Sequence, residues 1–174
     1  MRALVVGRFQ PLHNGHKALV RAALERCGAV TVAIGSSTAK PGLKNPFSAA
    51  ERRRMVEAAF PDELARGVLA IVEVPDLHDP PRYAAHALAL AAAAAGPVTT
   101  VFGNDDETLD LFEAAGVRVE RPGLVDRERC EARSIRAQLA ADDSAWRKAV
   151  PPAVADLLLK LDAGRRLRGM EAYA

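Results

Sequence analysis

Five short apolar runs alternate with longer stretches of helical periodicity along the chain. The runs are typical of buried strands, and the apolar residues between them recur at the three- and four-residue spacing of helices. The strand-like runs are RALVVG (2–7), AVTVAIGS (29–36), VLAIVEVP (68–75), VTTVFG (98–103) and VRVERP (117–122). Strands separated by helices imply right-handed crossovers. The alternation therefore predicts an α/β protein with a mostly parallel sheet and helices on both faces.

The length of 174 residues suits one domain, which we expect to span residues 1–174. Its last part, from Ser134 to Leu161, has helical periodicity interrupted by Val150-Pro151-Pro152, and proline is tolerated in the first turn of a helix. The final stretch, about 162–174, carries three arginines. We expect C-terminal helices followed by a loosely held tail.

The balance of charge limits the kinds of partner. The chain has 24 basic and 22 acidic residues, a net charge of +2, which argues against broad, sequence-independent binding of nucleic acid. Cys27 and Cys130 lie far apart in the sequence without the spacing of metal ligands, and we expect both to be reduced thiols. We also expect a homo-oligomer.

No basic-then-apolar leader opens the sequence. The longest apolar run, AAHALALAAAAAG (84–96), is rich in alanine, contains a histidine and is too short to span a bilayer. The sequence therefore predicts a soluble, cytoplasmic protein that does not bind membranes.

The stretch GRFQPLHNGH (7–16) follows the first apolar run and precedes a helical pattern, so it is predicted to be a strand-to-helix loop. Such a loop lies at the carboxyl edge of a parallel sheet, where open α/β sheets bind ligands, and it ends at the N-terminus of a helix. His13 and His16 are one helical turn apart and can donate hydrogen bonds to the same phosphate. On spacing alone, the pair also fits metal ligands or ordinary surface histidines.

Four segments together indicate a family. GRFQPLHNGH resembles the HxGH signature of the nucleotidyltransferase superfamily, in the extended GRFQPxHxGH form of archaeal-type nicotinamide mononucleotide (NMN) adenylyltransferases. NPFSAAER (45–52), FGND (102–105) and RSIR (133–136) resemble that family's PFTxxER, GN and SxTxxR segments. The resemblance covers nearly the whole chain.

This resemblance implies a Rossmann-like, three-layer α/β/α domain that joins NMN and ATP to give NAD and pyrophosphate, with Mg²⁺ as the divalent cation. No protein nucleophile is needed, because the phosphate of NMN can attack the α-phosphorus of ATP. The protein must position the substrates and stabilise negative charge. The side chains expected to do so are His13, His16, Arg8, Lys44 and Arg136.

The resemblance also implies two sets of binding residues. We expect the ATP site to include Gly7, Phe9, Gly15, Gly103, Asn104 and Ser134. Asp76 and Tyr83 match a residue pair that holds the nicotinamide ring in this family, although Tyr83 also fits a core residue. No protein ligand to a metal is expected, and acids that follow Asn104 are interpreted as helix-capping residues.

Arg133 departs from the family pattern, because relatives usually carry threonine at that position. Arginine at a helix start can bind phosphate in place of a hydroxyl, or it can point outward and leave Ser134 to donate. Other functions stay open. The acceptor could be nicotinic acid mononucleotide, flavin mononucleotide or phosphopantetheine, the donor could be CTP, or the chain could be a nucleotide-binding regulator without activity.

Overall fold

The computed structural model describes residues 1–77, 79–123 and 131–171. Cys130 and His78 lie outside this part of the chain, whereas Cys27 is a buried, free thiol. Within it, one sheet has five strands in the order β3-β2-β1-β4-β5, and all neighbouring strands are parallel. The strands are β1 (Arg2–Gly7), β2 (Ala29–Ile34), β3 (Leu69–Glu73), β4 (Thr100–Phe102) and β5 (Arg118–Glu120). Each lies within one of the five apolar runs, so the predicted parallel α/β sheet is confirmed.

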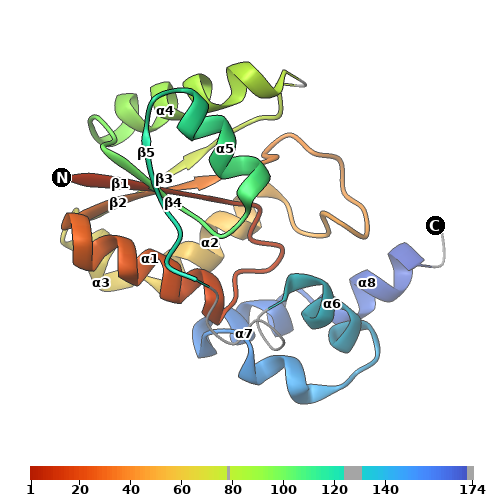
Figure 1. Ribbon diagram of the computed structural model, residues 1–174. Helices are drawn as coiled ribbons and strands as arrows, with labels where there is room; N and C mark the ends of the chain where they lie inside the picture. The colour runs from red at the N-terminus through yellow and green to blue at the C-terminus, as the bar shows by residue number, and fades with distance from the viewer. Residues whose placement is uncertain (78, 124–130, 172–174) are drawn as a thin grey trace.

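Helices cover both faces of this sheet (Figure 1). The helices of the α/β core are α1 (Asn14–Cys27), α2 (Ala49–Ala59), α3 (Pro61–Ala65), α4 (Pro80–Ala95) and α5 (Asp106–Ala114). Successive residues of β1 point to opposite faces, as a strand requires. Ala3 and Val5 pack in the cluster that contains residues of α1 and α2, whereas Leu4 packs with residues of α4 and α5. The fold is therefore the expected three-layer, Rossmann-like arrangement.

The strand order determines where a ligand can bind. β1 lies between β2 and β4, so successive crossovers run in opposite directions from the centre of the sheet. A crevice forms at the carboxyl ends of the strands on either side of such a switch point. The loop after β1 and the loop after β4 therefore flank the expected binding region.

The C-terminal helices form a separate layer beside the core, at the carboxyl edge of the sheet (Figure 1). They are α6 (Ala132–Ala140), the 3₁₀ helix η1 (Ser144–Lys148), α7 (Pro152–Lys160) and α8 (Ala163–Glu171). Pro152 occupies the first turn of α7, as predicted. Helix α7 packs on α2, and α8 packs on α6 and α7.

The prediction of a loosely held tail after residue 161 is wrong for residues 163–171, which form α8. Ala163 and Leu167 are buried in the main core. Arg166 donates two hydrogen bonds to the carboxylate of Glu51, at 2.7 and 2.9 Å. The arginines of this segment thus include structural residues. Their charge led to the prediction of a solvated tail instead of a short amphipathic helix.

The alanine-rich run forms α4, which lies against the sheet. Ala84, Ala87 and Ala91 are fully buried on one face of this helix. Their small side chains let the helix lie close to β2 and β3, which it contacts. Among the helices of the described residues, none is both long and apolar enough to cross a membrane.

Candidate active site

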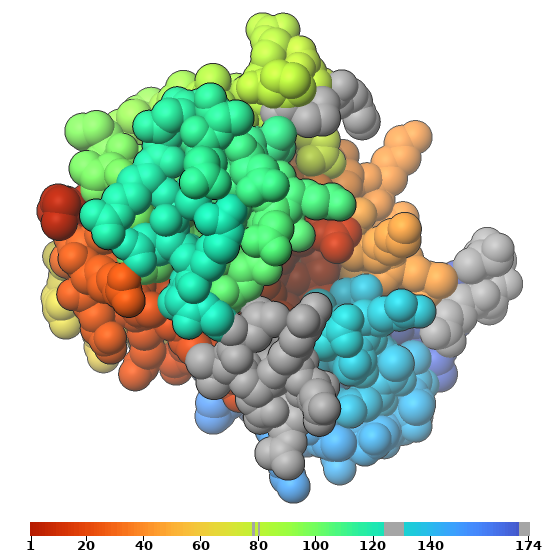
Figure 2. All heavy atoms as spheres, viewed as in Figure 1, coloured from red at the N-terminus to blue at the C-terminus, as the bar shows by residue number. Residues whose placement is uncertain are grey.

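A cleft of about 570 Å³ opens at the carboxyl edge of the sheet. In Figure 2, red residues from the start of the chain are visible at its floor, between the green α5 region and the blue C-terminal helices. The end of β1, residues following four of the strands, and residues near the N-termini of α1, α4, α5 and α6 line it. They are Val6, Gly7, Arg8, His13, Gly15, His16, Leu19, Gly35, Ser36, Asp76, Tyr83, Asn104, Asp105, Thr108, Glu131 and Ala132.

His13 and His16 form a reciprocal cap at the N-terminus of α1. The His13 Nδ1 accepts the backbone N–H of His16, and the His16 Nδ1 accepts the backbone N–H of His13, both at 3.3 Å. The rings are stacked, with centroids 3.6 Å apart. An Nδ1 that accepts a hydrogen bond carries no proton, so each neutral ring carries its proton on Nε2. Two Nε2–H donors are thereby available at the cleft.

Both imidazoles are held in the neutral form. Burial lowers the pKa of His13 to about 4. Burial, with a further contribution from His13, lowers the pKa of His16 well below its usual value. Protonation at Nδ1 would also break the reciprocal cap. The pair is therefore suited to donate hydrogen bonds from Nε2 to an anion, rather than to exchange protons at neutral pH.

The ring of Phe9 packs against that of His16. Its side chain is buried, and its ring lies 4.7 Å from the ring of His16. A Cβ at Gly7 would lie 3.0 Å from the Phe9 Cζ, so glycine at position 7 gives the ring room. Phe9 was expected to contact nucleotide, but it is a core residue that fixes the position of His16. Gly7 and Gly15 line the cleft as expected.

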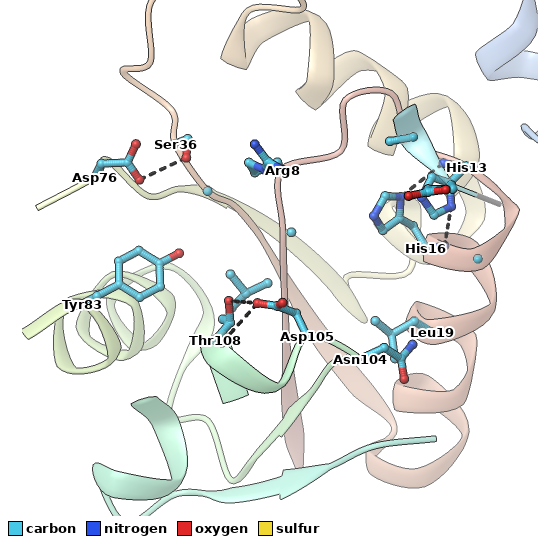
Figure 3. Close-up of a pocket in the computed structure, with 16 residues that line it drawn as sticks. Arg8, His13, His16, Leu19, Ser36, Asp76, Tyr83, Asn104, Asp105 and Thr108 are labelled. Atoms are coloured by element: carbon cyan, nitrogen blue, oxygen red, sulfur yellow. Dashed lines mark hydrogen bonds between the residues drawn. The ribbon is translucent and has the colours of Figure 1, made fainter. Parts of the chain in front are cut away.

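Arginines gather where the loop after β1 meets α6. Arg136 donates a hydrogen bond to the backbone oxygen of Gln10 at 2.7 Å. Burial lowers the pKa of Arg136, and the charges of Arg8 and Arg133 lower it further. Arg8 lines the cleft and lies between its two ends in Figure 3. Mutual repulsion among these three cations would be relieved by a bound polyanion.

The other end of the cleft contains Ser36, Asp76 and Tyr83 (Figure 3). The Ser36 hydroxyl donates a hydrogen bond to the Asp76 carboxylate at 3.0 Å. Burial, together with the charge of Asp76, raises the pKa of Tyr83 to about 12, so its hydroxyl keeps its proton. The Tyr83 ring is half-buried and packs edge-on against Phe112, with centroids 6.4 Å apart. Tyr83 therefore belongs partly to the core and partly to the cleft.

Residues after β4 form one wall. Asn104 lines the cleft as expected, whereas Gly103 lies behind it, where a Cβ would be 3.0 Å from the Leu109 side chain. The Asp105 carboxylate accepts hydrogen bonds from the backbone N–H and the hydroxyl of Thr108, and so caps α5. The predicted capping role of these acids is thus confirmed for Asp105.

Lys44 and Ser134, like Phe9, Gly103 and Arg136, are not among the residues that line the cleft. Lys44 is exposed and lines a second hollow, formed by the loop 41–45 and residues of α8, instead of the cleft. The Ser134 hydroxyl donates to the Glu131 carboxylate at 3.4 Å, and Ser134 is not among the residues that line the cleft. Lys44 lies in a loop, about whose conformation motif spacing carries no information, whereas Ser134 lies in α6 and its hydroxyl bonds to Glu131.

Sequence reasoning missed two buried residues that shape the cleft. The Gln10 side chain makes two hydrogen bonds of 2.9 Å with the backbone N–H and oxygen of Phe47, and ties the loop after β1 to the start of α2. The Arg52 guanidinium donates to backbone oxygens of Arg8, Gly35 and Ser36. Gln10 belongs to the motif GRFQP and Arg52 to the motif PFSAAER, and their place in these motifs is the sequence signal that could have identified them.

Within residues 1–77, 79–123 and 131–171, no group of three or more His, Cys, Asp or Glu side chains is arranged to hold a metal ion. Mg²⁺ is commonly held by substrate phosphates, water and one or two carboxylates instead of a protein cage. Asp76, Asp105 and Glu131 are the carboxylates that line the cleft. The site therefore fits a cation that arrives bound to a polyphosphate.

The protein has a Rossmann-like sheet, hydrogen-bond donors for an anion at the first strand-to-helix turn, and a second polar end in the same cleft. These features define a nucleotide-binding α/β protein with space for a second ligand. The family model described as cytidylyltransferase-like matches residues 4–110. The chain belongs to this family.

Two relatives that match the chain over nearly its full length carry the same, more specific name. The nicotinamide-nucleotide adenylyltransferase of Ignicoccus hospitalis is 36% identical over 169 residues, which cover 97% of this chain and 96% of the relative. The protein of the same name from Picrophilus torridus is 33% identical, with 98% and 97% covered. Among solved structures, a bifunctional NMN adenylyltransferase/ADP ribose pyrophosphatase from Francisella tularensis, complexed with AMP and a manganese ion, has a TM-score of 0.78 at 18% identity. It covers 99% of this chain, which spans about half (53%) of that protein.

Proposed function

We propose that the protein is a nicotinamide-nucleotide adenylyltransferase, which transfers AMP from ATP to NMN and forms NAD⁺ and pyrophosphate. The observation that carries this proposal is the stacked pair of His13 and His16, whose Nε2–H donors are presented to the cleft at the N-terminus of α1. Relatives of that name match the chain over nearly its full length.

The reaction needs no nucleophile from the protein. An oxygen of the NMN phosphate attacks the α-phosphorus of ATP, a new P–O bond forms, and the bond between the α-phosphorus and the bridging oxygen of pyrophosphate breaks. Negative charge develops on the α-phosphoryl oxygens and on the leaving pyrophosphate. The protein accelerates this step by holding the two substrates in line and by directing fixed donors at the developing charge.

The ATP phosphates bind at the His13 and His16 end of the cleft. The positive end of the α1 dipole favours an anion there. His16 donates to the reacting α-phosphate and His13 to a neighbouring phosphate oxygen. Arg8 and Arg136 supply positive charge for the β- and γ-phosphates. Mg²⁺ bound to ATP would neutralise part of the charge of these phosphates.

The NMN ring binds at the end that contains Ser36, Asp76 and Tyr83. The carboxylate of Asp76 can accept a hydrogen bond from the amide of nicotinamide, whereas it repels the carboxylate of nicotinate. Tyr83 offers the exposed part of its ring for stacking. This arrangement favours NMN over nicotinic acid mononucleotide.

The proposal is tested by incubating the purified protein with ATP, Mg²⁺ and NMN and by measuring NAD⁺ and pyrophosphate, which should form in equal amounts. Formation of neither product from these substrates contradicts it. If flavin mononucleotide or phosphopantetheine then gives a dinucleotide-type product, the chain is a different transferase of the same family. Binding of ATP without turnover of any acceptor indicates a regulator.

Three expectations about partners and location stay predictions: association into a homo-oligomer, a cytoplasmic location and no binding of nucleic acid. The first is tested by sedimentation of the purified protein, the second by fractionation of cells, and the third by titration with labelled RNA and DNA.

A further inference from the structure

Arg52 is the largest fully buried side chain of the core, with 1% of its surface exposed. Its guanidinium donates four hydrogen bonds, all to backbone oxygens. Nη1 donates to Arg8 at 2.8 Å and to Gly35 at 2.7 Å, Nη2 to Ser36 at 3.0 Å, and Nε to Ser48 at 3.3 Å. In the described residues, no carboxylate lies within ion-pair distance of it. This buried cation is therefore solvated by the main chain.

The accepting oxygens lie where the sheet stops. β1 and β2 pair in register up to Gly7 and Ile34, and Gly35 N–H donates to the Gly7 oxygen at 2.9 Å. Beyond this bond the two strands separate, and Ser36 adopts a positive φ of 48°. Arg52 lies across the separation and bonds to Arg8 on one side and to Gly35 and Ser36 on the other. Its planar guanidinium therefore joins the two strands beyond their last main-chain hydrogen bond.

The residues on the two sides serve different ends of the cleft. The loop that begins at Arg8 leads to His13 and His16 at the anion-binding end, whereas Ser36 donates to Asp76 at the other end (Figure 3). Arg52 itself does not line the cleft. Because its nitrogens are already engaged by main-chain oxygens, it is not available to bind a phosphate.

We propose that Arg52 is a positioning residue that fixes the distance between the ATP end and the acceptor end of the cleft, by joining the strand ends that carry Arg8 and Ser36. This inference rests on the proposed transfer of AMP between two substrates in that cleft. Transfer requires the phosphate of NMN to lie in line with the α-phosphate of ATP, so a small change in the distance between the two ends of the cleft slows the reaction. Each substrate can still bind at its own end.

Arg52→Lys is the decisive variant. Lysine keeps the positive charge but replaces the planar fork by one ammonium group, which cannot hold the oxygens of Arg8, Gly35 and Ser36 in the same geometry. We expect kcat to fall by about 10²-fold, while the Kd values for ATP and NMN, measured separately, change by less than about threefold. Arg53→Lys is the matched control, because Arg53 is the next residue of α2 and makes an ion pair with Glu73 near the surface. Its kcat should match that of the wild type.

A second measurement needs no substrate. Hydrogen exchange of the free protein should become faster in Arg52→Lys within the segments 7–10 and 34–38, and should stay unchanged in α1 and α5. Unchanged exchange in both segments contradicts the link between the strand ends. Exchange that becomes faster throughout the chain reveals a general structural role and overturns the proposal.

The kinetic outcomes are also decisive. A kcat equal to that of the wild type, at a temperature where the variant is fully folded, overturns the positioning role, as does a loss that appears only as weaker binding of ATP. Failure of the proposed function is distinguishable from these outcomes, because the wild-type protein would then form no NAD⁺ while the exchange experiment could still be scored.

Discussion

The Nδ1 atoms of His13 and His16 each accept the backbone N–H of the other residue at 3.3 Å. Because of this reciprocal cap, the two nitrogens of each ring have different roles. Nδ1 serves the structure of α1, and Nε2–H is left for a ligand. The structural and the catalytic contributions of His16 can therefore be separated by two substitutions.

His16→Asn keeps an acceptor near the position of Nδ1 and loses the donor at Nε2, whereas His16→Gln places an amide N–H near Nε2 and loses the cap. For His16→Asn we expect kcat to fall by about 10²–10³-fold, as when one donor to a developing oxyanion is removed. His16→Gln should retain more of kcat but lose about 0.5–2 kcal/mol of stability, the usual contribution of a cap. Steady-state kinetics and urea unfolding measure both. Equal kcat values for the two variants would refute the assignment.

The low pKa values of the two histidines predict a loss of stability in acid. The folded His13 has a pKa of about 4 against 6.5 for an ordinary histidine, so below pH 6.5 the unfolded state takes up the proton first. The free energy of unfolding should therefore fall as the pH decreases from about 6.5 to about 4, by up to about 1.4 kcal/mol per pH unit for each histidine. Urea unfolding at several pH values measures this slope.

The control for this prediction is His13→Asn, which can keep the cap but does not titrate. Its slope should be smaller than that of the wild type over the same pH range. The pKa of Glu51 also lies below its usual value of 4.5, because hydrogen bonds from Arg166 and Ser48 outweigh the effect of burial, which acts to raise it. Its contribution has the same sign but begins at lower pH. A wild-type stability that is flat down to about pH 5 would show that the histidines are not held neutral.

Asp76 is predicted to select between acceptors. Asp76→Asn removes the negative charge that repels nicotinate, so the ratio of kcat/KM for NMN to kcat/KM for nicotinic acid mononucleotide should fall by at least about fivefold, or about 1 kcal/mol. Ser36→Ala is the matched variant, because it removes the hydroxyl that donates to Asp76 but keeps the charge. Its ratio should stay near the wild-type value. An unchanged ratio in Asp76→Asn would place the nicotinamide ring elsewhere.

Arg166 is predicted to stabilise the docking of α8. It makes a partly buried, two-bond ion pair with Glu51 and a hydrogen bond of 3.2 Å to the Pro46 oxygen. Arg168, on the same helix, pairs with the well-exposed Asp142. Arg166→Met should lower the free energy of unfolding by about 1 kcal/mol, and Arg168→Met by less than about 0.5 kcal/mol. The reverse order in urea unfolding would contradict the role given to Arg166.

Local patterns predicted the elements of this fold because each strand and core helix carries its own periodicity. The capping box that Ser48 and Glu51 form at the start of α2 is a local feature of the same kind. The carboxyl ends of the strands of a parallel sheet meet at one edge, so the sequence predicts that Arg8, Asp76 and Asn104 lie near one another. Their roles toward ligands stay predictions.

Long-range contacts were beyond the reach of these patterns. The hydrogen bond from Arg136 to Gln10 joins residues 126 positions apart, and those of Arg52 depend on how two loops leave the sheet. The burial of Phe9 and the position of Lys44 are properties of loop conformation. Helix α8 was missed because a segment rich in arginine is normally solvated, and its ion pair with Glu51 is visible only in three dimensions.

Transfer of AMP to NMN can be tested by measuring kcat/KM with ATP, Mg²⁺ and a panel of acceptors: NMN, nicotinic acid mononucleotide, flavin mononucleotide and phosphopantetheine. We expect NMN to have the highest value, at least about tenfold above flavin mononucleotide and phosphopantetheine, which corresponds to about 1.4 kcal/mol in the transition state. A tenfold preference for either of those two acceptors would contradict it.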